Sequence, residues 1–227
     1  MLLAITVLLT ALGIWGQYLR CFPDVIQNIS GPWYEFGLDF LSHEFDLNAE
    51  QNIPTYFNTL LLVISAALFG IIAAHKRGIK DKFRYHWTFL ALLFLYLSVD
   101  ETAVIHEKLI KPIRAAIGIG NWFYFAWVVP AIIVLAVLAL AYITFFLHLS
   151  TRFKILFFTS LFIYFAGAVG GEMLSGHFAE ILGQRSFAFA VISSLEEAVE
   201  LGGASLLIFA LLKYMGFDLK QVSIKTE

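Results

Sequence analysis

Acidic side chains recur inside the apolar segments of this 227-residue chain. An ionised carboxylate at membrane depth costs several kcal/mol unless it is paired, protonated or bound to a metal ion, so such residues usually belong to a site. Eight carboxylates and two histidines occur in this way. They are Asp100, Glu101, His106 and Glu107 in one segment, Glu172, His177 and Glu180 in a second, and Glu196, Glu197 and Glu200 in a third. We predict that all of them except Glu180 bind a metal ion.

Carboxylates combined with one or two imidazoles suit hard and intermediate cations. Helical bundles build di-iron sites from four carboxylates and two histidines on facing helices, and the inventory here matches that count. The Glu-x-x-His spacing of those sites is missing, because Glu172 and His177 are five residues apart. The sequence therefore predicts a divalent metal cofactor, which could be Fe, Mn, Zn or Ca. A metal-free alternative is a hydrated vestibule whose acids are partly protonated or paired with nearby basic residues.

The segments that carry these acids are long enough to cross a membrane. The chain is 60% hydrophobic and 14% charged, with a mean hydropathy of +0.81, whereas a soluble domain has about 25% charged residues. Apolar runs of roughly 20 residues recur along it. We predict an all-α integral membrane bundle, a single domain over residues 1–227 with six transmembrane helices. They cover residues Leu2–Leu19, Tyr56–His75, Tyr85–Glu107, Trp122–Leu149, Ile155–Ile181 and Phe187–Tyr214.

Lysine and arginine predict the orientation of the bundle. Ten of the 15 basic residues fall in regions that six spans would place on one face, namely the connectors after the second and fourth spans and the C-terminal end. We expect this face and both termini to be cytoplasmic. The predicted site then faces the outer side, together with an acidic connector over residues 20–55 that contains Asp24, Glu35 and Glu44.

Three segments that are distant in sequence place their acids at one depth. Counted from the inner ends of their helices, Asp100 lies at about 22 Å, Glu172 at about 25 Å and Glu200 at about 21 Å, at 1.5 Å per residue. Helical phase places these three in an inner layer, and Glu107 and His177 in an outer layer with Glu196 or Glu197. Glu101 and His106 should point elsewhere unless the helix end unwinds.

Glycines favour a close approach of the last two predicted helices. Gly167 and Gly171 form a Gly-x-x-x-Gly pair, and Gly170, Gly202 and Gly203 are also small. Small residues at these positions let two membrane helices pack backbone to backbone. We expect this contact to bring Glu172 and Glu200 together.

The connector ends in alternating oxygen donors, which are Asp46, Asn48, Glu50 and Asn52. The pattern is similar to a calcium-binding loop, but it lacks the glycine and the terminal glutamate of an EF-hand. Turn and capping roles ahead of the next helix are the alternative. In either case this stretch could fold over the acids as a lid.

The composition argues against a nucleic-acid partner and against sites built from cysteines. Nucleic acid is not expected as a partner, because the chain has no basic cluster with interleaved aromatic residues. Cys21 is the only cysteine, which excludes an internal disulfide and a Cys-x-x-Cys metal site.

Several motifs resemble those of uncharacterised bacterial multi-pass membrane proteins. The motifs are Glu50-x-Asn52-Ile53-Pro54 leading into Phe57-Asn58-Thr59, Ser98-Val99-Asp100-Glu101 with His106-Glu107, and Leu195-Glu196-Glu197 with Glu200. This resemblance covers most of the chain and implies the bacterial inner membrane as its location. The first and second motifs are also faintly similar to the alkaline ceramidase superfamily of membrane hydrolases, which has a three-histidine zinc site. This chain has glutamates in place of the histidine pair on the last helix.

The leading hypothesis is a metal-dependent membrane enzyme, a hydrolase or an oxidoreductase, that acts on a lipid or another hydrophobic substrate. A carrier or channel for protons or divalent cations is the alternative. The nearly uncharged inner halves of the third, fifth and sixth spans argue against it. An accessory subunit of a larger membrane complex, or a homo-oligomer, is a third possibility.

Overall fold

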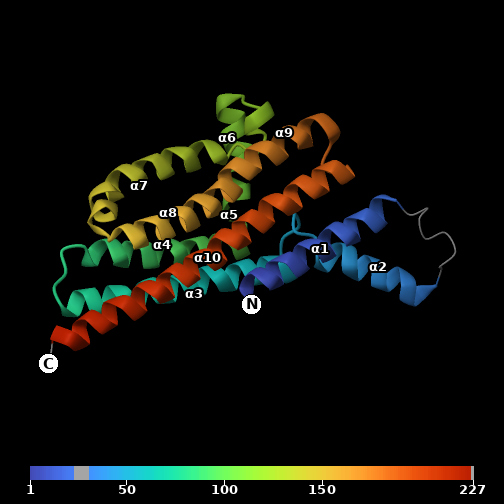
Figure 1. The fold of residues 1–227 in the computed structure, drawn as a ribbon. Coiled ribbons are helices and arrows are strands. Elements are labelled where there is room, and N and C mark those ends of the chain that lie inside the picture. Colours follow the sequence, from blue (N-terminus) through green and yellow to red (C-terminus); the bar gives the residue numbers. More distant parts are fainter. Residues whose placement is uncertain (23–30, 226–227) are drawn as a thin grey trace.

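A computed structural model describes residues 1–22 and 31–225, which leaves Asp24 outside the described residues, and the described part contains helices but no strand. Figure 1 shows their arrangement. The α-helices are α1 (Leu2–Cys21), α2 (Pro32–Glu44), α3 (Ile53–Gly78), α4 (Arg84–Ala103), α5 (Ile105–Lys108), α6 (Ile110–Ile117), α7 (Val128–His148), α8 (Thr151–Phe165), α9 (Glu172–Leu182) and α10 (Phe187–Lys225). A 3₁₀ turn, η2 (Asn121–Phe123), precedes α7, and a π-helix, η3 (Ala166–Gly171), joins α8 to α9.

Four helices in the described residues are long and apolar enough to cross a membrane. These are α1, α3, α7 and the continuous stretch Thr151–Leu182, and the bent pair Arg84–Ala103 and Ile105–Ile117 would make a fifth. The prediction of an all-helical membrane protein is therefore confirmed. A sixth span in α10 and the cytoplasmic location of both termini stay predictions.

The first helix runs beside the first half of α10. The rings of Tyr18 and Phe22, at the end of α1, contact Phe187 at the start of α10 with centroid distances of 5.7 and 5.5 Å. The N-terminus consequently lies beside the middle of the long α10, away from the end of the bundle where α10 finishes (Figure 1). The two termini are not level along the bundle axis.

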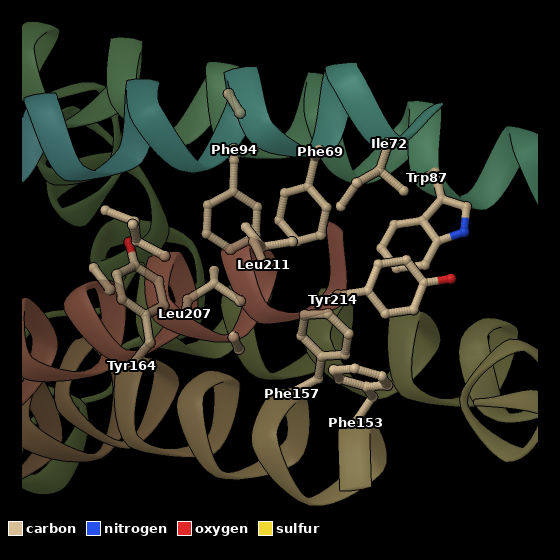
Figure 2. Close-up of a cluster of buried hydrophobic side chains, with 14 of the residues drawn as sticks. Phe69, Ile72, Trp87, Phe94, Phe153, Phe157, Tyr164, Leu207, Leu211 and Tyr214 are labelled. Atoms are coloured by element: carbon tan, nitrogen blue, oxygen red, sulfur yellow. The ribbon is translucent and has the colours of Figure 1, made fainter. Parts of the chain in front are cut away.

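A core of aromatic and aliphatic side chains fills the space between α3, α4, α8 and α10 (Figure 2). Trp87 is at its centre, 2% exposed, with ring centroids 4.9 Å from both Phe145 and Tyr214. Burying each large side chain stabilises the fold by about 2–3 kcal/mol. This core fixes the halves of the helices on the predicted inner side and so determines where their other halves meet.

Glycine contacts hold α10 against α8 and η3, as predicted. A Cβ atom added to Gly203 would lie 2.3 Å from the Tyr164 backbone nitrogen, and one at Gly167 would lie 2.8 Å from the Glu200 nitrogen. Gly170 and Gly202 face no atom within 4 Å, so the prediction was wrong for these two. At Gly203 and Gly167 the two backbones can touch, because a glycine carries only hydrogen atoms on its Cα.

The acidic connector contains a helix that the sequence analysis did not predict. This helix, α2, packs on α1, where Gln17 Nε2 donates a hydrogen bond of 2.8 Å to the Ser42 carbonyl. Asn52 then caps α3, because its Oδ1 accepts from the Thr55 backbone N–H and its Nδ2 donates to the Asp46 carbonyl at 2.6 Å. Capping, the alternative to calcium binding, therefore describes Asn52 and fixes the turn that precedes α3.

Candidate functional site

The predicted site residues meet in one cavity of about 320 Å³, which we call the acidic cavity. Eight of the nine line it, from α4, α5, α9 and α10, and Glu50 of the connector joins them. The charged and imidazole lining consists of Glu50, Asp100, Glu101, His106, Glu107, Glu172, Glu196, Glu197 and Glu200. The prediction was based on the equal depth of these acids along three helices, and in the structure they line one cavity. Asn48 and Glu50, at the end of the connector, also line the cavity, and a lid role for the connector stays a prediction.

A break between α4 and α5 changes the direction of the chain between Glu101 and His106, and both side chains belong to this lining. Helix α4 and the stretch Ile105–Ile117 that follows it meet at a bend of 66° at Val104, which has a φ of 54°. Asp100 holds the bend, since its Oδ1 accepts the His106 backbone N–H at 3.0 Å and its Oδ2 lies 2.8 Å from the His106 ring Nδ1. A β-branched residue with positive φ is an outlier that costs of order 1–3 kcal/mol. The break meets the condition stated for His106, whereas Glu101 lines the cavity from the regular part of α4, so the expectation that it points elsewhere was wrong.

The π-helix η3 directs Glu172 towards the same space. Each π-turn contains one more residue than an α-turn, which rotates everything after it relative to α8. The segment lies against α10, where a Cβ atom on Gly171 would be 2.4 Å from Glu196 Cγ. A glycine is needed there to let the Glu196 side chain pass into the cavity.

Several buried polar atoms on the cavity wall have no hydrogen-bond partner. They are Trp127 Nε1, Glu172 Oε2 and Glu196 Oε2. Behind the wall, Asn58 is 1% exposed, and its amide lies beside the carboxyl groups of Glu101 and Glu200. Each unsatisfied buried group costs about 1–3 kcal/mol. The wall therefore presents donors and acceptors that a bound molecule could satisfy.

The connector carboxylate Glu50 interacts with the other acids through its charge. Burial, and after it the nearby Glu107 charge, raise the pKa of Glu50 to about 7, while the Thr55 hydroxyl donates to Glu50 Oε2 at 3.4 Å. No lysine or arginine is among the described residues that line the cavity. Its carboxylates are consequently left without a protein counter-charge apart from His106.

The arrangement is not a preformed metal site. Within the described residues, no three histidine, cysteine, aspartate or glutamate side chains converge at distances that would hold a metal ion. The donor types still fit a hard cation, because oxygen ligands predominate. Binding of a metal ion would require carboxylate side chains to rotate towards one another.

His177 is the one predicted site residue that does not line the cavity. Its ring stacks on Trp122, with centroids 4.5 Å apart and an interplanar angle of 2°, and its Nδ1 lies 2.5 Å from Asn121 Oδ1. The carboxylate of Glu180 accepts the Asn121 backbone N–H. These contacts tie the η2 turn to α9 on the outside of the bundle.

A second, apolar cavity of about 600 Å³ adjoins the acidic one between α4, α7 and α8. Aromatic and aliphatic residues line it, among them Phe69, Trp87, Phe94 and Phe157 of the core in Figure 2. Both cavities share the lining residues Leu93, Leu135, Leu138, Phe165 and Val169. The two spaces therefore lie end to end, polar at one end and apolar at the other. We call the second space the apolar cavity.

A family model described as a domain of unknown function, DUF8692, matches residues 2–214. The chain belongs to this family. No curated protein and no solved structure gives a significant match. The predicted membership of an uncharacterised family is thus confirmed, whereas nothing in these comparisons links the chain to the alkaline ceramidase superfamily.

Three cavity features of this DUF8692 protein escaped the sequence analysis. Asn58 was noted only as part of a motif, and neither Trp127 nor Tyr164 was singled out. Asn58 lies within an otherwise apolar helix, and a buried amide there needs a partner. That is the signal by which it could have been added to the site.

Proposed function

We propose that the protein is a membrane enzyme that acts on a lipid or another hydrophobic substrate in the acidic cavity, with a divalent metal ion as cofactor. The observation that carries this proposal is the junction of the two cavities. A reactive head group would lie among carboxylates that can exchange protons, and the rest of the molecule would remain in an apolar space.

A metal ion would relieve the electrostatic cost of so many carboxylates. Glu101, Glu197 and Glu200 lie near one another on α4 and α10, and each feels the charge of another member of this group. We propose these three as the metal-binding residues, with the amide oxygen of Asn58, which lies beside Glu101 and Glu200, as a further ligand. A cation held there would polarise a substrate oxygen and activate water.

The apolar cavity favours an enzyme over an ion pathway. An ion that crosses a membrane needs polar groups to replace its hydration shell along the whole route. No charged residue lines the apolar cavity within the described part of the chain. The space that continues from the acidic cavity is therefore suited to hydrocarbon and not to protons or cations.

The test is metal analysis by mass spectrometry on purified, detergent-solubilised protein from cells supplied with Fe, Mn, Zn and Ca. We expect about one or two equivalents of one metal in the wild type, as in helical-bundle sites. A double variant, Glu101→Gln with Glu200→Gln, should lose the metal. The control Glu180→Gln changes an exposed carboxylate outside the cavity and should keep it. A wild type without metal, or equal metal in all three proteins, would refute the metal site.

A further inference from the structure

The charges of the acidic cavity favour one sign of ligand. Eight carboxylates and one histidine line it, with no lysine or arginine among the described lining residues. An anionic head such as a sulfate would meet a few donors there, such as Trp127 Nε1, but its charge would be repelled by every ionised carboxylate of the lining. A cationic head would meet complementary charge and relieve the repulsion among the carboxylates.

Aromatic residues stand between the carboxylates. Tyr96, Phe125, Trp127 and Tyr164 all line the acidic cavity. An ammonium group is attracted to aromatic faces, most strongly to that of tryptophan, and the gain reaches about 2 kcal/mol when the group is desolvated. Carboxylates combined with aromatic rings in a half-buried space form the combination that recognises an ammonium group.

The apolar cavity would hold the remainder of the same molecule. Its lining on α7 extends from Leu135 to Leu149, a length of about 21 Å along the helix axis. In the predicted orientation it runs from the outer leaflet towards the inner side. A lipid whose head lies in the acidic cavity would have its chain along this path.

Helix α7 forms one wall of both cavities and is the least packed helix of the bundle core. In its most apolar window only 11% of the residues are buried, and its backbone approaches the rest of the bundle mainly at η3. Phe145 joins α7 to the core at one end. Along its middle one side of α7 lines the apolar cavity, whereas Leu140 on the opposite side is 73% exposed. A lipid can reach the cavities from the bilayer by displacing this wall.

We infer that the substrate of the acidic cavity is a lipid with an ammonium head group, whose hydrocarbon chain occupies the apolar cavity and which enters from the bilayer beside α7. This inference rests on the proposed function for the location of the site, but it does not require the metal ion.

The test measures equilibrium binding of three probes to the purified protein in neutral detergent with a chelator present. The probes are a long-chain primary alkylamine, an alkyl sulfate with the same chain, and a short alkylamine. We expect the long-chain amine to bind at least about tenfold more tightly than either of the others. Equal binding of the amine and the sulfate would overturn the inference, and this comparison needs no variant.

Two substitutions on α7 test the position of the chain. Leu138→Trp places a larger side chain at the junction of the two cavities and should weaken binding of the long-chain amine by about tenfold. Leu140→Trp, on the lipid-exposed side of the same helix, should leave the affinity unchanged. Equal affinities for both variants would exclude the chain from the apolar cavity. Amine binding without bound metal would overturn only the cofactor, whereas bound metal without amine binding would overturn only this inference.

Discussion

Replacing Gly203 by alanine tests the contact that places α10 against α8. The added Cβ would lie 2.3 Å from the Tyr164 nitrogen and 2.6 Å from its Cα. Both are backbone atoms, so no rotamer change can relieve the clash. Ordinary van der Waals contact begins at 3.4 Å, so the helices must separate by about 1 Å. Overpacking of this kind costs about 3 kcal/mol, of which about 1 is offset by the better helix propensity of alanine.

The neighbouring Gly202 provides a matched control. It has the same chemistry and helix, but its added Cβ meets nothing within 4 Å, so Gly202→Ala should stabilise the protein by about 1 kcal/mol. The two variants should therefore differ by about 3 kcal/mol in the free energy of unfolding, or on the order of 10 °C in Tm. Thermal unfolding in detergent, followed by circular dichroism, measures the difference. Equal shifts, or a stabilised Gly203→Ala, would refute the backbone contact.

Three further substitutions probe the surroundings of the acidic cavity. The pKa of Glu50 is about 7 in the folded protein against an ordinary 4.5, so the folded protein retains a proton that the unfolded chain releases. The free energy of unfolding should therefore fall by up to about 3 kcal/mol as the pH rises from about 4.5 to 7. Glu50→Gln should flatten that part of a profile of Tm against pH. Val104→Gly should raise stability by about 1 kcal/mol in the same melts, because it removes the positive-φ strain, and a loss of stability would contradict that strain. Glu197→Gln should stabilise the metal-free protein by about 1–2 kcal/mol in thermal melts with a chelator present, because it removes one of several crowded carboxylates. Glu180→Gln changes an exposed carboxylate and should have little effect. Destabilisation by Glu197→Gln would show that this acid is structurally paired.

The helical character of the fold was predictable because apolar runs of membrane length leave few alternatives. The break after Ala103 was not, since Val104 is β-branched and gives no local signal for the left-handed region. The bend depends on Asp100, whose side chain caps the next helix after the chain has turned. Helix α2 was not predicted, because a mixed polar and aromatic sequence inside a connector is typical of both turns and surface helices.

The sequence could predict which residues line the cavity where this depended only on their depth along the helices. Counting along helices places acids at one level without any knowledge of how the helices are rotated, and eight residues share the cavity as a result. Rotation was harder, because the π-helix η3 changes the phase between α8 and α9. The spacing of Glu172 and His177 already indicated that His177 would not face the cavity. Five residues along an α-helix turn the chain by about 140° from the starting face, so the two side chains diverge.

Val104 and the residues of η3, which shape the acidic cavity, lie outside the aromatic core. Val104 adopts a costly backbone conformation, η3 interrupts a regular helix, and Gly171 leaves room for the side chain of Glu196. The aromatic core lies mainly in the other halves of the helices, and Tyr164 is a member of both the core and the cavity lining. Each irregularity is instead adjacent to a cavity residue, and each directs a carboxylate or imidazole into the same space. Selection for stability alone would remove such strain and such unpaired charge, so their concentration around one cavity is the physical argument that the cavity has a function.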